Sequence, residues 1–295
     1  MYRVSTAMQF TLARNTINTR RMELLTVQEH IATGRKVNTF AEDPVASRKV
    51  LQEQSTLRTT ESWRRTANEA QLLLETSDSI LATVGDNLDR AYELTVQMAN
   101  DTNSGENRQN AADEIRGIRE RIVELANTQR NGRSLFAGLG NASDPFQLDG
   151  SFSGDTGRLQ VPVGPRAVLD ATLGGGEPFL DAAGGRNTIE TLIELENRMR
   201  ADDGAQISDI IDEVQATIDR AAGARQQLGH RLVRLDTVYD ALDRAELAAD
   251  STLAEVRDTD IAEAVIRLRE SETGLQAALS ITGRLDDLSL LNFLR

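Results

Sequence analysis

The chain has 295 residues and no cysteine, which excludes disulfide bonds and thiolate metal sites. Its formal net charge of −13 argues against a nucleic-acid partner, because phosphate binding needs a basic surface. Apolar residues make up 39% of the chain and aromatic residues only 4%, which is typical of narrow helical seams. The sequence contains no run of 18 apolar residues, so it predicts no membrane insertion.

The N-terminal segment, residues 1–6, lacks the apolar core and cleavage site of a secretory signal. We therefore expect a chain that is either cytoplasmic or exported by a route that removes no signal peptide.

The first 33 residues predict an amphipathic helix that ends near Gly34, a residue type common after a helix C-terminus. Its positions at 3-4 spacing are Phe10, Ala13, Ile17, Arg20, Leu24, Val27 and Ile31. All but Arg20 are apolar, so the stripe needs a partner helix to cover it.

Residues 44–135 predict a long helical hairpin. Asp43 is a suitable N-cap, and Pro44 fits the first turn of the helix that follows. A heptad template runs through Trp63, Ala67, Ala70, Leu74, Ser77, Leu81, Val84, Leu88, Ala91, Thr95 and Met98. The template resumes at Ala111 after a loop at 100–107, and Asn131-Gly132 is expected to end the second helix.

Residues 136–187 hold 11 of the 21 glycines and four of the five prolines, which break helices and favour turns. Short pieces at 147–148, 159–161 and 167–169 resemble strands. We expect a small β-rich insert that rests on the helix tips. The local phenylalanines form its core by default, with a binding surface as the minor alternative; they are Phe136, Phe146, Phe152 and Phe179.

Residues 188–260 predict returning long helices, and residues 261–295 predict a final amphipathic helix. Capping-box spacing joins Asn187 to Glu190 and Asp260 to Glu263. From Ile207 a 4-3 template continues to Val256 with thirteen apolar positions out of 15. The last helix carries its apolar stripe on Ile261, Val265, Leu268, Leu275, Leu279, Leu285, Leu288, Leu291 and Phe293.

These elements predict a mainly α fold with a small β-rich insert. We expect an elongated antiparallel long-helix bundle or coiled coil, with the β domain at its tip and both termini at the opposite end. Residues 1–43 and 261–295 are the predicted assembly segments, 44–135 and 188–260 the helical body, and 136–187 the outward domain.

The sequence offers no catalytic, cofactor-binding or metal-binding constellation. His30 and His230 each stand alone within helical segments, where a metal role is far less common than a surface role. The acidic residues are spread along predicted helices, where no pocket would shift their pKa values for acid–base work. We therefore predict a protein that is not an enzyme.

The two ends carry the predicted function, and their stripes allow two interpretations. They either pair with each other within one chain or are ordered by packing against other copies. We favour assembly through Phe10, Ile17, Leu24, Ile31, Ile261, Val265, Leu268, Leu275, Leu279, Leu288, Leu291 and Phe293. The associated hypothesis is that both ends are largely disordered in the free monomer, because isolated amphipathic helices are marginal in water.

Three groups of motifs resemble the flagellin superfamily. The first is IATGRKVN at 31–38 followed by EDPVA at 42–46. The second is NTQRNGRSLFAG at 127–138 followed by DPF at 144–146. The third is DTDIAEA at 258–264, LQAAL at 275–279 and SLLNFL at 289–294. The motifs occur in the same order as in the superfamily. The motif with proline at position 44 is most similar to that of the branch that joins hook to filament.

The resemblance implies a structural subunit of the bacterial flagellum, exported unfolded through the flagellar secretion channel without a cleaved signal. Such subunits form a ring between hook-associated protein 1 and the first flagellins. Paired terminal helices build an inner coiled-coil core, the middle domain faces outward, and an export chaperone is implied. A filament flagellin is the alternative, a cytoplasmic coiled-coil binding module is the third hypothesis, and an enzyme is a distant fourth.

Overall fold

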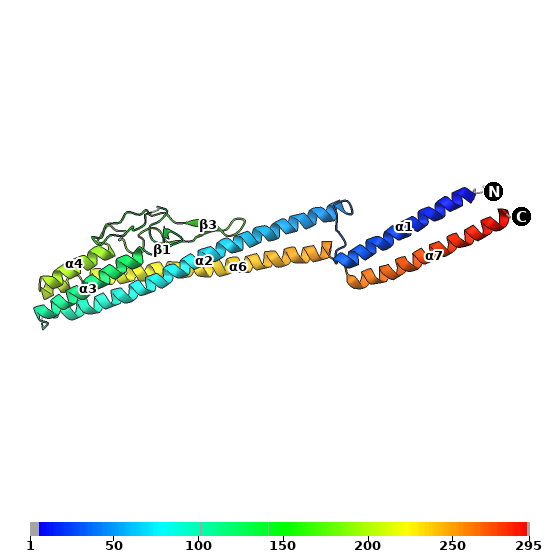
Figure 1. Cartoon of the computed structure of the whole chain (residues 1–295). Helices are drawn as coiled ribbons and strands as arrows, with labels where there is room; N and C mark the ends of the chain where they lie inside the picture. Colours follow the sequence, from blue (N-terminus) through cyan, green and yellow to red (C-terminus); the bar gives the residue numbers. More distant parts are fainter. Residues whose placement is uncertain (1–5, 101, 141, 294–295) are drawn as a thin grey trace. The chain divides into compact units, whose positions relative to one another are not determined.

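The computed structural model describes residues 6–100, 102–140 and 142–293; the side chains of residues 6, 7, 9 and 285–293 lie outside this description. Its helices are α1 (Thr6–Thr33), α2 (Pro44–Met98), α3 (Gly105–Ala126), α4 (Thr188–Arg200), α5 (Gly204–Ser208), α6 (Ile211–Arg257) and α7 (Ile261–Phe293) (Figure 1). Its strands are β1 (Gln129–Arg130), β2 (Arg133–Ser134), β3 (Gln160–Pro162) and β4 (Val168–Asp170). The strands form two antiparallel pairs, β1–β2 and β3–β4. The predicted mainly helical fold with a small β insert is confirmed.

The chain divides into two compact units. The terminal unit comprises Met1–Arg58 and Ala245–Arg295, and the central unit comprises Thr59–Arg244. Helices α2 and α6 contribute residues to both units, whereas α1 and α7 belong to the terminal unit alone.

In the central unit, α2 and α6 pack along the predicted heptad seam. Polar contacts join them at successive levels: the Arg225 guanidinium lies 3.0 Å from the Asp78 carboxylate, and the Tyr239 hydroxyl lies 2.7 Å from Asn68 Oδ1. The seam is buried at every seventh residue of the returning segment, at Ile207, Val214, Ala221, Leu228, Leu235 and Leu242. A seam of period seven against a neighbouring helix is the geometry of a coiled coil.

Helices α3 and α4 form a second layer in the central unit. Ser104 caps α3 by accepting the Asn107 N–H, and Asn187 and Glu190 make the predicted capping box of α4. Between the two helices, Arg119 and Glu196 form an ion pair whose side chains are only 14% and 12% exposed. This layer buries a further apolar stripe on Ala111, Ala112, Ile115, Ile118 and Ile122.

Arg108 of α3 joins the α2–α3 turn to the α4–α5 turn at one end of the central unit. Its guanidinium donates to the backbone carbonyls of Met98 and Asn100 at the end of α2. It also lies 2.7 Å from the carboxylate of Asp202, which follows α4. A single buried side chain thus satisfies carbonyls that a helix C-terminus leaves without partners.

The end of α3 differs from the prediction made for Asn131-Gly132. The helix ends at Ala126, and these two residues instead form the turn between β1 and β2. Their φ angles are 53° and 74°, the left-handed values that a two-residue hairpin turn requires. Asparagine followed by glycine satisfies that requirement better than any other common pair, so the hairpin formed here instead of a helix stop.

The β-rich insert has an aromatic core. Phe136 and Phe146 both meet Phe179 edge to face, with ring centroids 5.5 and 4.9 Å away, and Phe152 packs on Phe146. Phe136, Phe146 and Phe179 are each at most 1% exposed. The default expectation of a small core is confirmed.

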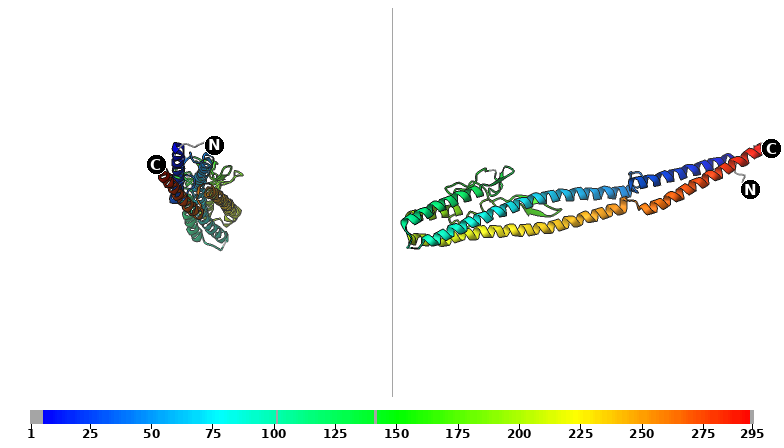
Figure 2. Two further views of the ribbon diagram at one scale, coloured as in Figure 1. Left: turned by 90° about the vertical axis from the view of Figure 1, so that its right-hand side faces the viewer. Right: turned by 60° about the horizontal axis from the view of Figure 1, so that its bottom comes forward.

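The insert lies against the side of the helices rather than beyond their ends. Arg231 and Arg234 of α6 donate to the carbonyls of Thr172 and Val168, which pins the β3–β4 region to that helix (Figure 2). The sequence predicted the insert at the bundle tip, whereas the turns joined by Arg108 form that end of the central unit. The difference arises because α3 and α4 run back from the turns and carry the insert with them.

We predict that Arg108→Ala lowers the free energy of unfolding by about 2–4 kcal/mol, because it removes a buried guanidinium that joins two turns and leaves the Met98 carbonyl without this donor. Urea denaturation followed by circular dichroism measures the change. Arg116→Ala is the matched control, because its i,i+3 pair with Asp113 is about half exposed and should contribute less than about 1 kcal/mol. Equal losses for the two variants would contradict this role of Arg108.

Candidate assembly interface

Helices α1 and α7 form an antiparallel pair in the terminal unit (Figures 1 and 2). The half-buried face of α1 is the predicted stripe of Phe10, Ala13, Ile17, Leu24, Val27 and Ile31. The facing residues of α7 also follow 4-3 spacing and are Ala264, Leu268, Ser271, Leu275, Ala278 and Thr282. Among the described side chains of the two helices, only Ala264 is fully buried.

The structure brings together only part of the predicted stripe. Phe10, Ile17, Leu24 and Ile31 of α1 share the seam with Leu268 and Leu275 of α7. Ile261, Val265 and Leu279 instead lie outside it, with exposures of 49%, 37% and 51%. The side chains of Leu288, Leu291 and Phe293 lie outside the described residues. The two candidate seams of α7 share Leu268 and Leu275, so spacing alone did not separate them.

Helix α1 carries a second apolar face that the sequence analysis missed. Its members are Met8, Leu12, Met22 and Leu25, and their exposures range from 48% to 69%. Met8 and Met22 each stand two positions before a seam residue, which is about 200° around an α-helix. Leu12 and Leu25 are next to Ala13 and Leu24 and lie on the flanks of the seam. A heptad template follows a single stripe of the helix. The apolar residues outside that stripe are the signal in the sequence that indicates this face.

Helix α7 likewise directs large aliphatic side chains away from α1. Ile266 and Ile281 are 59% and 61% exposed, in addition to the exposed residues of the predicted stripe. A soluble surface helix usually has one apolar stripe and a polar remainder. Large exposed apolar patches are common where one protein meets another.

A short polar junction fixes where this helix pair begins. The Lys36 N–H donates to the Arg257 carbonyl at 2.8 Å, and the Thr259 N–H donates to the Gly34 carbonyl at 2.9 Å. Gly34 has a φ of 68°, a left-handed value that suits glycine after a helix. Two backbone hydrogen bonds therefore join the α1–α2 loop to the α6–α7 loop.

Capping residues complete the junction. Asp43 accepts the N–H groups of Val45 and Ala46 at the start of α2, and Asp260 accepts those of Ala262 and Glu263 at the start of α7. The predicted N-caps are thus observed. The Glu42 carboxylate accepts the Asn38 and Thr39 N–H groups, and these bonds hold the pKa of Glu42 below its usual value of 4.5.

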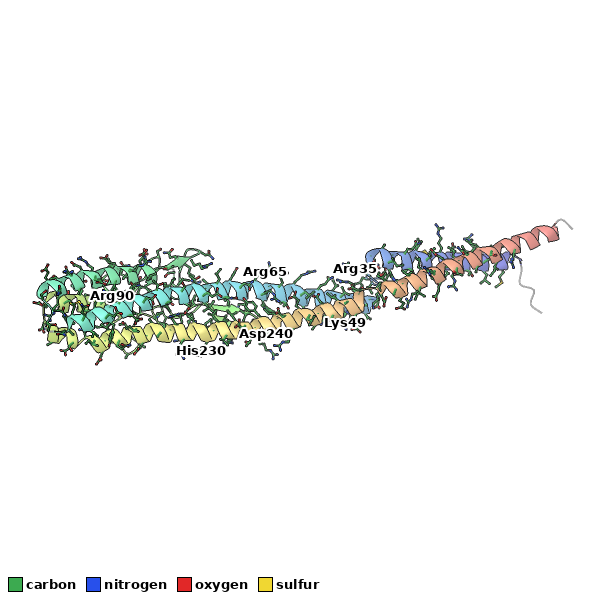
Figure 3. The ribbon with its side chains drawn as sticks, turned by 90° about the horizontal axis from the view of Figure 1, so that it is seen from below. Arg35, Lys49, Arg65, Arg90, His230 and Asp240 are labelled. Carbon is green, nitrogen blue, oxygen red and sulfur yellow. The ribbon has the colours of Figure 1, made fainter. Side chains whose placement is uncertain are left out.

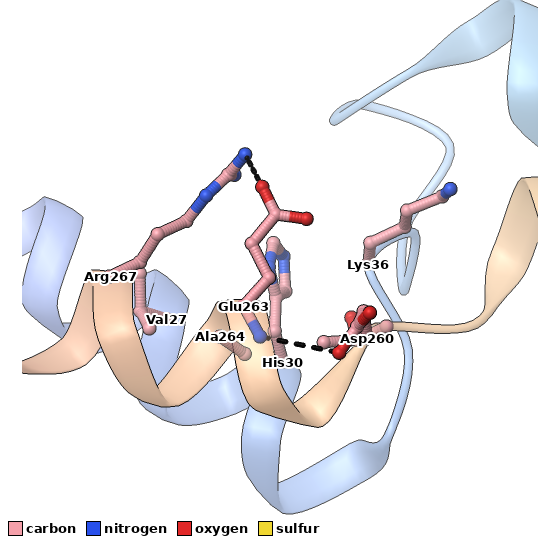
Figure 4. Close-up of a pocket in the computed structure, with 8 residues that line it drawn as sticks. Val27, His30, Lys36, Asp260, Glu263, Ala264 and Arg267 are labelled. Atoms are coloured by element: carbon pink, nitrogen blue, oxygen red, sulfur yellow. Dashed lines mark hydrogen bonds and ion pairs between the residues drawn. The ribbon is translucent and has the colours of Figure 1, made fainter.

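A cleft of about 220 Å³ beside the junction gathers charged side chains. His30, Lys36, Asp260, Glu263 and Arg267 line it, and Glu263 pairs with Arg267 (Figure 4). The acidic groups here cap a helix or pair with a cation, which is a structural use of charge. His230, the other histidine, is exposed on α6 (Figure 3). Within the described residues, no three His, Asp or Glu side chains are grouped for metal binding.

Two family models match the chain. The model of the bacterial flagellin N-terminal helical region matches residues 4–141, and that of the flagellin C-terminal helical region matches residues 209–294. The chain belongs to the flagellin family. Both matches include the terminal helices whose apolar faces are exposed.

Two curated relatives refine this membership. Flagellar hook-associated protein 3 of Salmonella typhimurium is 31% identical over 156 residues, which is 52% of this chain and about half (49%) of the relative. Flagellar hook-associated protein 3 of Escherichia coli is 26% identical over 276 residues, covering 77% of this chain and 86% of the relative. As a flagellin-family member, the chain is a structural, non-enzymatic component of the bacterial flagellum.

A solved structure shares the fold. A flagellar hook-associated protein from Vibrio parahaemolyticus has a TM-score of 0.68 and 20% identity, covering 74% of this chain and 100% of that one. Helices long and apolar enough to cross a lipid bilayer do not occur in the described part of this flagellin-family chain.

We predict that protonation of Glu42 loosens the junction loop. A folded-state pKa below the unfolded value means that the stabilisation is fully present above about pH 4.5 and is lost as the pH falls through the folded pKa. NMR titration should show the amide shifts of Asn38 and Thr39 moving with this group. Glu42→Gln should abolish that titration; its persistence in the variant would assign it to another group.

We also predict that amides in α1 and α7 exchange with solvent faster than those in α3 in the free monomer. The reason is that one half-buried seam protects the terminal pair, whereas α3 packs into a closed core. Hydrogen–deuterium exchange of the soluble full-length chain tests this. Protection of the terminal helices equal to that of α3 would mean that the pair is complete without another copy.

Proposed function

We propose that the chain is the subunit that joins the flagellar hook to the filament. In this proposal, copies form a ring between hook-associated protein 1 and the first flagellin subunits. The names of the two curated relatives support a hook-associated role. The observation that carries the proposal is the pair of terminal helices whose apolar faces stay exposed in one chain.

These exposed faces supply the free energy for assembly. Fully burying one large aliphatic side chain contributes on the order of 1.5–3 kcal/mol. Several such side chains on α1 and α7 would together exceed the cost of fixing the subunits in place. One isolated helix pair is therefore a weak structure, whereas the same pair inside a ring is a strong one.

The two faces of the pair have different roles in this proposal. The seam of Phe10, Ile17, Leu24, Ile31, Leu268 and Leu275 holds α1 to α7 within one subunit. The outer residues Ile261, Val265 and Leu279 contact neighbouring subunits, together with the second face of α1. Leu288, Leu291 and Phe293 are proposed to extend the interface along the same helix. Residues 1–43 and 261–295 thus act as the assembly domain, and residues 136–187 face outward.

Export precedes assembly in this proposal. The chain passes unfolded through the flagellar secretion channel, and no signal peptide is removed. Terminal helices with exposed apolar faces would associate prematurely in the cytoplasm. A chaperone that covers them until export is therefore part of the proposal.

We predict that deleting the gene leaves hooks without filaments and releases flagellin into the medium. The wild-type chain should restore filaments, whereas Leu279→Asp should not, because it places a charge on the proposed contact face. Electron microscopy of the appendages and the flagellin content of the medium measure the effect. Circular dichroism checks that the variant keeps its helices.

Leu139→Asp is the matched control, because Leu139 lies in the insert and is 55% exposed, close to the 51% of Leu279. It should restore filaments as the wild type does. Full rescue by Leu279→Asp would exclude this face from assembly. Long filaments formed by the purified chain alone would instead identify it as a filament flagellin.

A further inference from the structure

A second cleft in the terminal unit lies between the α1–α2 loop and the start of α2. Apolar and polar side chains line it together, and the lining includes Arg35, Val37, Phe40, Val50, Leu51 and Arg257. The cleft has a volume of about 220 Å³. Phe40 and Leu51 are 55% and 56% exposed. Only 4% of the residues of this chain are aromatic, and Phe40 is one of them.

The segment that supplies most of the cleft lining is basic in an acidic chain. Residues 34–58 carry five cationic side chains against three carboxylates, whereas the whole chain has a net charge of −13. Lys36 and Lys49 are the only lysines in the sequence, and both fall in this segment. No carboxylate lines the cleft. Arg257 pairs with Asp258 at 2.7 Å, whereas no ion pair of Arg35 occurs within the described residues.

The terminal unit also presents a surface with the opposite properties. Leu247 of α6 is 72% exposed, and Asp250 lies one turn further along the same face. Ala249, two positions after Leu247, is 2% exposed in the seam, so Leu247 points about 200° away from that seam. Leu247 is thus an apolar ridge with a carboxylate beside it.

We propose that the Leu247–Asp250 ridge of one copy docks into the Phe40–Leu51 cleft of the next copy in the ring. Leu247 would pack on Phe40 and Leu51 while the Asp250 carboxylate meets Arg35. This inference rests on the proposed ring. It names the contact that sets the register between neighbouring subunits.

The symmetry of the contact follows from the fact that each copy carries both surfaces. Ridge and cleft are different surfaces, so each copy offers one to each neighbour. Such a contact is heterologous, and heterologous contacts close into a ring when the rotation between copies allows it. The exposed faces of α1 and α7 supply apolar area, and the charged ridge and cleft supply register.

Cross-linking tests the contact directly, because the chain has no cysteine of its own. Two full-length chains, Leu51→Cys and Leu247→Cys, are expressed together in a strain that lacks the native gene. Isolated appendages are treated with a short bismaleimide. Covalent dimers should form from the mixture and not from either chain alone. Leu51→Cys mixed with Leu139→Cys is the matched control and should give none.

Charge reversal provides a second measurement. Arg35→Glu and Asp250→Arg should each lower the dimer yield about fivefold or more, and the double variant should restore it. Arg65→Glu, at an exposed site on α2, should leave the yield unchanged.

If the Leu51→Cys and Leu247→Cys chains enter the appendage and support filaments but give no covalent dimers, this contact is wrong and the proposed function stands. If the charge reversals show no rescue, the Asp250–Arg35 pairing is likewise overturned. Absence of the wild-type chain from isolated appendages would overturn the proposed function and this inference together.

Discussion

A pair of helices can bury only one stripe of each partner. The two units of the chain differ in whether further elements cover the other sides of the helices. In the central unit, α3, α4 and the insert add further layers, so α2 and α6 are covered on more than their shared seam. In the terminal unit, α1 and α7 have only each other along most of their described length. Their remaining large apolar side chains are exposed in the single chain.

The junction between the helices is polar, and this gives the terminal pair a fixed starting point. Two backbone hydrogen bonds join Gly34, Lys36, Arg257 and Thr259, and aspartates cap the helices that leave the junction. These bonds act over a few ångströms and need no apolar core. The first turns of the pair are thus aligned locally, while the strength of the pair depends on what covers its outer faces.

The sequence predicted the central seam well because a seven-residue repeat over many turns has one geometric solution. It predicted the helix starts at Pro44, Thr188 and Ile261 because a cap is a local signal. It did not resolve the face of α7, because Leu268 and Leu275 fit two stripes equally. Only the position of α1 decides between the stripes, and that is tertiary information.

The distribution of side-chain size on α7 argues most directly for assembly. Apart from Leu268 and Leu275, the residues facing α1 are small: alanine, serine and threonine. The large aliphatic residues Ile261, Ile266 and Ile281 face outward. A helix that served the monomer alone would gain most by placing its largest apolar side chains in the seam, where each buried methylene contributes about 0.8 kcal/mol. The observed arrangement leaves the larger hydrophobic surface on the outside of the pair, where the proposed assembly would bury it between subunits.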